Sequence, residues 1–210
     1  MDVGQIAGLW RYPVKSLKAE PLARATVLAD GFDGDRTAAL VVESPAHARA
    51  GKPYRGKESA QLHRTADPVT AASYAADAGV LVTLDRSRPR WFDAGTVSVL
   101  LDLWVRDVEA LVGEPLDPQR WRPNVYVTAA PGFAKREADL VGAALHAGGV
   151  VLRVVRPIRR CVTPTYDIAT GESSPLVLEA VAAQRDNVVG VYCEVEVPGE
   201  LAVGDALRLE

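Results

Sequence analysis

One cysteine lies in a strongly basic stretch of the chain, RRCVTPTYD, which runs from Arg159 to Asp167. A thiol attacks a substrate or binds a soft metal as the thiolate, and neighbouring guanidinium charge favours that form. Arg159 and Arg160 directly precede Cys161, and no acidic residue follows before Asp167. The stretch therefore predicts sulfur chemistry at Cys161. The alternative is that Cys161 is a small buried apolar residue beside solvated arginines.

Two further clusters have the residue types of an anion site. In YPVKSLK, Lys15 and Ser16 follow Pro13, which ends a strand, so they begin a loop that offers an ammonium, a hydroxyl and main-chain N–H groups. In RWRPNVYV, Arg122 and Asn124 stand at the start of a strand and are suited to a phosphate or a heterocycle edge. An exposed turn and a structural salt bridge, respectively, are the alternatives.

Several other kinds of chemistry have no support in the sequence. There is no Walker loop, GxGxxG, CxxC or GxSxG motif. His47, His63 and His146 are far apart and lack the spacing of zinc ligands, so a zinc site is not expected. Cys161 and Cys193 are the only cysteines, too few for a disulfide framework and typical of a reducing compartment.

Charge and hydropathy limit the partners. A formal net charge of −3 gives no overall preference for nucleic acid or for an anionic membrane, so an anion site must be local. The N-terminus lacks the pattern of a secretory signal, and no apolar run approaches the length of a membrane-spanning helix. We expect a cytoplasmic protein that binds a small-molecule substrate and neither nucleic acid nor membrane.

The positioning elements are expected to be mainly strands. Short Val-rich and Leu-rich runs separated by glycine turns dominate both ends of the chain, and no regular alternation of strand and helix appears. The pattern predicts a mainly β, barrel-like fold with a few helices, and a long surface loop over residues 47–64. Helices are predicted after Asp67-Pro68, over Thr96 to Val112, and after Ser174-Pro175. DRSRPR, between Leu84 and Trp91, interrupts the pattern, and we place a domain division there, into residues 1–88 and 89–210.

These segments, in this order, resemble a known family. YPVKSL, DGFDGDR, RWRPNVYV, RRCVTPTYDIATGE and GVYCEVEVPGELAVGDALRL are similar to the molybdenum cofactor sulfurase C-terminal (MOSC) domain family, preceded by its N-terminal β-barrel domain. The resemblance spans nearly the whole chain. It implies a MOSC N-terminal β-barrel domain packed on a MOSC β-barrel domain. It is closest to the members that reduce amidoximes and other N-hydroxylated compounds.

The resemblance also implies roles for individual residues. Cys161 would be the protein ligand to molybdenum, and the molybdopterin of the cofactor would be held by cationic and polar groups from both domains. These cofactor-binding residues would be Lys15, Ser16, Arg36, Arg122, Asn124 and Arg160. A cofactor with a terminal phosphate and a dithiolene suits cationic donors, and a thiolate is a soft ligand that such a metal accepts.

Three positions depart from the family pattern. Asp102 and Trp104 stand where hydroxyl residues are expected, and Pro164 follows Cys161 where a hydroxyl residue is more usual. No proton donor is assigned. Asp167 is the nearest carboxylate, although an Asp before a Thr-Gly turn typically caps a loop.

The implied activity needs an external source of electrons. Nothing in the sequence suggests an iron–sulfur cluster, haem or flavin, so we expect a separate electron-donor protein, ferredoxin-like or cytochrome b5-like with its reductase. The basic segment from Lys52 to Arg64 is a candidate docking surface. Two alternatives to an enzyme stay open: a non-catalytic carrier of the molybdenum cofactor, and a sulfur carrier that uses a Cys161 persulfide.

Overall fold

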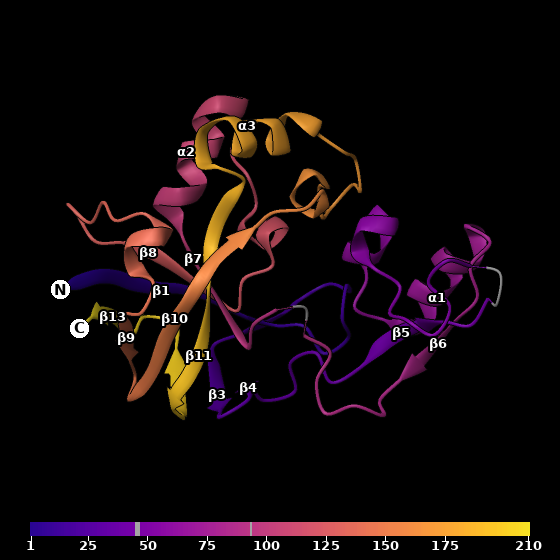
Figure 1. Cartoon of the computed structure of the whole chain (residues 1–210), viewed down its shortest axis with the longest axis horizontal. Helices are drawn as coiled ribbons and strands as arrows, with labels where there is room; N and C mark the ends of the chain where they lie inside the picture. Colours follow the sequence, from indigo (N-terminus) through magenta and orange to yellow (C-terminus); the bar gives the residue numbers. More distant parts are fainter. Residues whose placement is uncertain (45–46, 93) are drawn as a thin grey trace.

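The computed structural model describes residues 1–44, 47–92 and 94–210 and has two lobes (Figure 1). A barrel with helices at one end forms the larger lobe. Beside it lies a smaller lobe built around one helix and two strands. We call the described residues of 12–19 and 36–85 the small lobe and the remainder the barrel lobe.

Seven strands close the barrel in the order β13-β9-β10-β11-β7-β8-β1, because β13 also pairs with β1. Among the described barrel strands, only the β7–β8 pair is parallel. The strands are β1 (Asp2–Arg11), β7 (Val97–Leu101), β8 (Val125–Ala129), β9 (Ala144–Ala147), β10 (Val150–Arg159), β11 (Val188–Val197) and β13 (Ala206–Leu209). The mainly β fold is confirmed. Since β1 lies between β8 and β13, the first strand completes a barrel otherwise built from the second half of the chain; the division at residue 88 stays a prediction.

Short strands complete the sheets outside the barrel. They are β2 (Glu20–Leu22) on the edge of β1, the three-stranded sheet of β12 (Gly199–Ala202), β3 (Arg24–Leu28) and β4 (Gly31–Phe32), and the pair β5 (Ala39–Val42) and β6 (Val82–Asp85). The β5–β6 pair belongs to the small lobe, whose own core includes Leu40, Val42 and Leu62. Each lobe therefore buries a separate apolar cluster.

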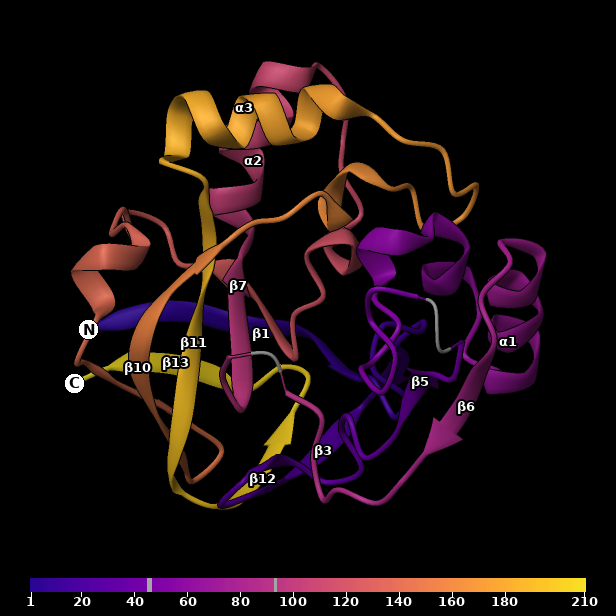
Figure 2. The same ribbon diagram turned by 45° about the vertical axis from the view of Figure 1, so that its right-hand side comes forward.

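Within residues 1–44, 47–92 and 94–210, three α-helices cover these sheets: α1 (Pro68–Asp77), α2 (Asp102–Val112) and α3 (Pro175–Arg185). Figure 2 shows α2 and α3 over one end of the barrel and α1 on the outside of the small lobe. The predicted start of α1 is confirmed, because the Asp67 carboxylate accepts hydrogen bonds from the amides of Val69 and Thr70. The Ser174 side chain makes no such cap at α3. No helix in the described part of the chain is long and apolar enough to cross a membrane.

The helix predicted over residues 96–112 is wrong in its first third. Val97–Leu101 is strand β7, all five residues of which are buried, and α2 begins only at Asp102. A strand covered on both faces is apolar without alternation, so its side chains also satisfy a helical spacing. Residues Val97–Leu101 form a strand because β7 pairs with β11 on one side and with β8 on the other.

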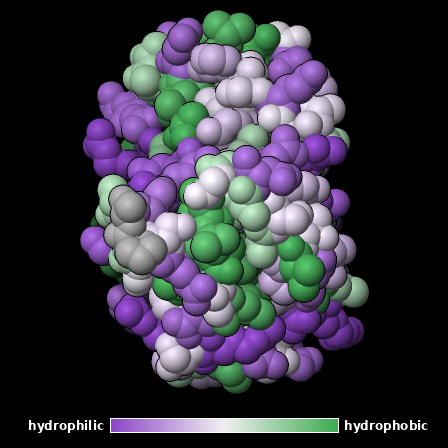
Figure 3. All heavy atoms as spheres, turned by 90° about the vertical axis from the view of Figure 1, so that its right-hand side faces the viewer, coloured by the Kyte–Doolittle hydropathy of each residue, from purple (hydrophilic) through white to green (hydrophobic). Residues whose placement is uncertain are grey.

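The surface loop predicted over residues 47–64 is also wrong in part. It contains the short 3-10 helices η1 (Gly56–Glu58) and η2 (Ala60–Arg64), and Tyr54, Leu62 and His63 are buried. The other 3-10 helices are η3 (Pro118–Trp121), η4 (Glu137–Leu140) and η5 (Thr163–Thr165). The outer face of the small lobe carries apolar side chains among polar ones (Figure 3), and Val69 and Leu81 are exposed in this lobe.

Candidate functional site

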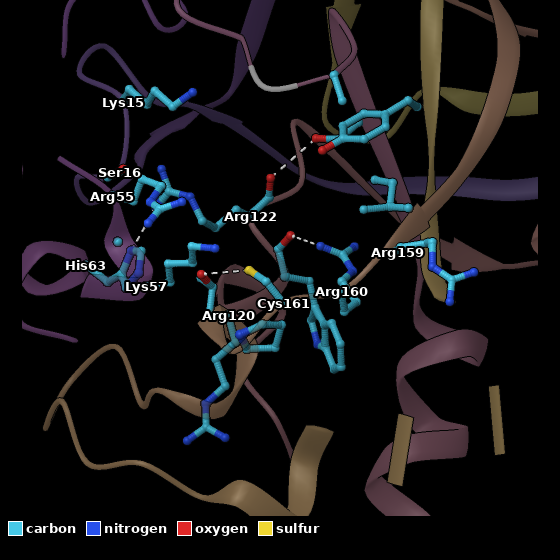
Figure 4. Close-up of a pocket in the computed structure, with 18 of the residues that line it drawn as sticks. Lys15, Ser16, Arg55, Lys57, His63, Arg120, Arg122, Arg159, Arg160 and Cys161 are labelled. Atoms are coloured by element: carbon cyan, nitrogen blue, oxygen red, sulfur yellow. Dashed lines mark hydrogen bonds between the residues drawn. The ribbon is translucent and has the colours of Figure 1, made fainter. Parts of the chain in front are cut away.

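A cavity of about 430 Å³ lies between the two lobes (Figure 4). The small lobe contributes residues from the loop after β1 and from the segment around η1 and η2. The barrel lobe contributes η3, the ends of β10 and β11, and the turn that follows β10. The lining residues are Lys15, Ser16, Arg36, Arg55, Gly56, Lys57, His63, Ala94, Ser98, Arg120, Trp121, Arg122, Arg156, Ile158, Arg159, Arg160, Cys161, Thr163, Pro164 and Tyr192.

The lining is strongly cationic. Nine of these residues are lysine or arginine, and none of the described lining residues is aspartate or glutamate. Such a concentration of one sign of charge produces a strong local field, although the whole chain carries a formal net charge of −3. The cavity is therefore built to receive an anion.

Cys161 lies in this cavity just after the end of β10. Its side chain is exposed, and its Sγ donates a hydrogen bond to Thr163 Oγ1 at 3.3 Å. Pro164 lies in η5, the turn that directly follows, where the Thr165 hydroxyl donates to Val162 O at 2.7 Å. The turn holds the backbone while leaving the sulfur accessible.

Cys193 has the opposite environment. It lies on β11, is fully buried in the barrel core, and burial raises the pKa of its thiol. A buried protonated thiol behaves as a small apolar side chain. The structure therefore separates a thiol suited to chemistry from one suited to packing.

Arg160 is held rigidly beside Cys161. Its guanidinium donates to Val189 O and to Trp121 O, both at 2.7 Å, and stacks over the Trp121 ring. Burial lowers its pKa to about 10, so Arg160 still carries its charge at neutral pH. A Cβ at Gly190 would lie 2.9 Å from Arg160 Nη2, so the glycine makes room for this side chain.

Arg36 brings a second, partly buried cation from the small lobe. It forms an ion pair with Asp35, a fully buried carboxylate that also accepts from the Tyr12 amide at 2.7 Å. Its guanidinium lies over the Tyr12 ring, 4.8 Å from the centroid. Asp35 and Tyr12 thus fix the direction of the Arg36 side chain.

The Arg122 guanidinium also lies over the Tyr12 ring, 4.2 Å from the ring centroid. Its Nη1 donates to Leu17 O at 2.7 Å and lies 3.2 Å from Nδ1 of His63. Burial and the neighbouring Arg122 charge lower the pKa of His63 to about 3. His63 is therefore neutral, and because Nδ1 faces an arginine N–H, we assign the proton to Nε2.

Backbone conformation singles out the same residues. Five non-glycine residues in the described part of the chain have positive φ angles, and three of them are Ser16, Arg36 and Arg122, at 72°, 50° and 55°. Such conformations are costly and cluster at functional sites, where the surrounding structure imposes them. At Arg36, for example, the backbone N–H donates to Tyr12 O and the carbonyl accepts from the Trp91 amide.

Six of the seven predicted site residues line the cavity: Lys15, Ser16, Arg36, Arg122, Arg160 and Cys161. Asn124 is the exception. It is 1% exposed, and its Oδ1 accepts from the amide and hydroxyl of Ser98 at 3.1 and 3.0 Å, while its Nδ2 donates to Trp10 O. Asn124 lies behind the wall and supports Ser98, which does line the cavity.

Pro164, one of the three residues that depart from the family pattern, lines the cavity, whereas Asp102, Trp104 and the nearest carboxylate, Asp167, lie outside it. Asp102 accepts from the Ala129 amide at 2.9 Å, and Trp104 donates to Lys135 O at 3.0 Å. Asp167 accepts hydrogen bonds from the amides of Thr170 and Ala169 and from Arg120. These contacts lower the pKa of Asp167, and the Thr170 amide has the largest effect. Asp167 is thus an ionised loop-capping residue.

Several lining residues were not predicted as site residues. Arg55 and Lys57 come from the η1 segment and Arg120 from η3, while Tyr192 and Arg156 come from neighbouring strands, with the Arg156 guanidinium 5.4 Å from the centroid of the Tyr192 ring. One signal was available for Tyr192: it precedes the buried Cys193 on a strand, so its side chain points to the opposite face. Arg156 lies on β10, close to Cys161 in sequence, whereas Arg55, Lys57 and Arg120 are brought in by segments remote from it.

Family models match both parts of the chain. The MOSC N-terminal beta barrel domain matches residues 3–82, and the MOSC domain matches residues 95–208, more than half of the chain. The protein belongs to the MOSC family. The family takes its name from molybdenum cofactor sulfurase, which associates this MOSC protein with the molybdenum cofactor at the level of the family.

Solved structures support the fold of this MOSC protein. The crystal structure of YuaD from Bacillus subtilis matches 99% of the chain and 95% of its own, with 17% identity and a TM-score of 0.60. YiiM from Geobacillus stearothermophilus matches 55% of the chain and 54% of its own, with 20% identity and a TM-score of 0.43, too low to support an argument. A comparison with curated proteins found no match.

The cavity of this MOSC protein fits the molybdenum cofactor in its donor set. Guanidinium and ammonium groups from both lobes suit a phosphate, and Cys161 supplies a soft ligand on the same wall. The described residues contain no group of three His, Cys, Asp or Glu arranged to hold a metal ion. A metal at Cys161 would accordingly need to bring most of its ligands with it, as a metal bound to molybdopterin does.

Proposed function

We propose that this protein is a molybdenum-cofactor oxidoreductase that reduces N-hydroxylated or similar small N-oxygenated compounds with electrons from a separate donor. One observation carries the proposal: the exposed Cys161 thiol opens into a cavity lined by nine cations and, among its described residues, by no carboxylate. When bound, the cofactor supplies two-electron chemistry that removes oxygen from nitrogen as water.

The chain's own residues would bind and orient the cofactor from two sides. Lys15, Ser16 and Arg36 would hold its anionic groups from the small lobe, and Arg122 and Arg160 from the barrel lobe. The buried Asp35, His63 and the carbonyls of Val189 and Trp121 hold three of these cations in place before anything binds. Such pre-organisation reduces the ordering cost of binding. Asn124 would act indirectly, through Ser98 and Arg36.

The reaction consumes two electrons and two protons and forms the amine or amidine and water. No carboxylate among the described lining residues supplies the protons. We propose that water does so, since the exposed side chain of Cys161 shows that solvent reaches this part of the cavity. The protein would thus contribute binding, orientation and charge, while the cofactor contributes the redox chemistry.

We propose further that the electrons come from an acidic carrier, ferredoxin-like or cytochrome b5-like with its reductase. The basic segment from Lys52 to Arg64 is the candidate docking surface, and its Arg55 and Lys57 reach the cavity. A donor bound there would lie next to the site. The cytoplasmic location stays a prediction.

The test uses protein produced in a host that makes the cofactor. We expect about one molybdenum atom per chain and reduction of a neutral amidoxime by reduced benzyl viologen. Molybdenum without turnover would favour a cofactor carrier. Absence of molybdenum, with a persulfide at Cys161 detected by mass spectrometry, would favour a sulfur carrier. Each outcome therefore identifies one of the three candidate functions.

A further inference from the structure

The cations of the cavity are not balanced by carboxylates. Three of the nine have carboxylate partners: Arg36 with Asp35, Arg55 with Glu58 and Arg120 with Asp167. Lys57, Arg156, Arg159 and Arg160 form no ion pair within the described part of the chain. The cavity therefore retains excess positive charge that a ligand must offset.

Three of these four cations are already used or directed elsewhere. Arg160 donates to two backbone carbonyls, and Arg156 donates to Ala94 O at 3.1 Å and lies over the Tyr192 ring. Figure 4 shows the Arg159 side chain pointing away from Cys161. Arg160 is assigned to the cofactor in the proposed function, and Arg156 and Arg159 are directed elsewhere, so none of the three is left to meet a substrate beside the sulfur.

Lys57 differs from the other three. It stands in η1 of the small lobe, is exposed, and its side chain points toward Cys161 (Figure 4). Its ammonium forms no hydrogen bond or ion pair with any residue that the structure describes. The backbone of Lys57 contacts the barrel lobe, because Lys57 O accepts a hydrogen bond from the Tyr166 hydroxyl at 3.5 Å. Lys57 thus presents a cation to whatever enters beside the sulfur.

We propose that Lys57 is a specificity-determining residue that recognises an anionic group on the substrate. The inference rests on the proposed function and adds a substrate class to it: N-hydroxylated compounds that carry a carboxylate. A carboxylate would pair with the ammonium, while a cationic substituent would be repelled by the whole lining. An exposed ion pair contributes up to about 1 kcal/mol, which corresponds to about a fivefold change in binding.

The test compares three benzamidoximes that differ only in the para substituent: carboxylate, methyl and trimethylammonium. Reduced benzyl viologen drives the holoprotein in every assay. We expect kcat/KM to decrease in that order, with the difference mainly in KM. Lys57→Gln should reduce the carboxylate-to-methyl preference about fivefold and leave the methyl compound nearly unchanged. Lys52→Gln, an exposed lysine of the same segment outside the cavity lining, is the matched control and should change neither.

A second measurement does not depend on turnover. Calorimetry on oxidised holoprotein should show tighter binding of the carboxylate compound, a difference that 0.5 M salt and Lys57→Gln both reduce. Equal binding of all three compounds would overturn the inference, as would loss of molybdenum from Lys57→Gln, which would place Lys57 in the cofactor cradle. If no compound is reduced although the carboxylate binds selectively, the proposed function fails and the anion selectivity stands.

Discussion

Arginine side chains have different partners in two regions of this protein, the Arg185 cluster and the cavity. At the Arg185 cluster (Arg185, Glu137 and Asp107), one buried guanidinium meets two carboxylates, with Nη2 at 2.6 and 2.7 Å from the Glu137 oxygens and Nη1 paired with Asp107. Glu137 also accepts from the Gly190 amide, so its hydrogen bonds are satisfied within the protein. In the cavity, nine cations are matched by few carboxylates. Charges that the fold balances stabilise structure, and charges that it leaves unbalanced indicate a ligand.

The largest expected effect is at the sulfur of the cavity. Cys161→Ala should reduce turnover at least about 100-fold because it removes the proposed metal ligand, while the free energy of unfolding stays near that of the wild type, since the side chain is exposed. Cys193→Ser should lower the free energy of unfolding and leave turnover by the folded protein near that of the wild type. Its hydroxyl would be buried in the core, at a cost of about 1–3 kcal/mol. Amidoxime reduction and urea unfolding of both variants check the pair, and full turnover by Cys161→Ala would disprove the ligand role.

The Arg185 cluster provides the structural side of the comparison. Arg185→Met should lower the free energy of unfolding by about 3–5 kcal/mol, because it leaves the Glu137 carboxylate buried without its partner. The double variant Arg185→Met with Glu137→Gln should be less destabilised than the single one. Molybdenum content of the folded fraction should not change. A loss of metal without a loss of stability would show that the two regions are not separate.

Arg122→Lys tests the cavity side. An ammonium lacks the planar guanidinium that lies over the Tyr12 ring and its donors other than Nη1, so cofactor retention should weaken by about 1–3 kcal/mol per lost charged hydrogen bond. Arg106→Lys, on the exposed face of α2, is the matched control and should have no effect on retention. Metal analysis after gel filtration measures retention. Unchanged molybdenum in both Arg36→Ala and Arg122→Ala would place the site elsewhere.

His63 should make stability depend on pH. Its pKa is lowered from 6.5 to about 3 in the folded protein, so between these values the unfolded chain binds a proton that the folded chain does not. The free energy of unfolding should therefore fall as pH decreases from about 6.5, by up to about 1.4 kcal/mol per pH unit, and His63 should contribute no slope above that range. His63→Gln, which retains an acceptor for Arg122, should remove this part of the slope. An identical pH profile in the variant would contradict the assignment.

The smallest effect concerns the electron donor. If an acidic carrier binds the segment from Lys52 to Arg64, the carrier-driven rate of reduction should fall several-fold as salt rises from about 0.05 to about 0.5 M, because salt screens surface charges. The viologen-driven rate should change little. NADPH alone should give no turnover. Direct NADPH-driven reduction by the isolated chain would reveal a nicotinamide site and remove the need for a carrier.

The charged cavity could be predicted in outline from local sequence. β10 delivers Cys161 to a strand end beside Arg160, and the turns at Lys15-Ser16 and at Arg122 were recognisable as anion-binding segments from proline and cation spacing. The helix expected over 96–112 failed because a strand buried on both faces has no periodicity of its own. Asn124 looked like a ligand and proved to be a support, because its neighbours across the sheet satisfy its amide.

The sequence by itself determined the mainly β character of the chain, the one cysteine in a basic setting and most of the cations around it, because these depend on residues close together in the chain. Tertiary structure decided which of these cations meet in one cavity. Lys57 lies more than a hundred residues before Cys161, yet the packing of the small lobe on the barrel brings its side chain to the same cavity. Local sequence already pairs Arg36 with Asp35, a contact between two segments of the barrel lobe pairs Arg120 with Asp167, and Lys57 has no partner among the described residues. Ion pairs between near neighbours can be predicted from sequence spacing, but the gathering of cations from distant segments into one cavity cannot.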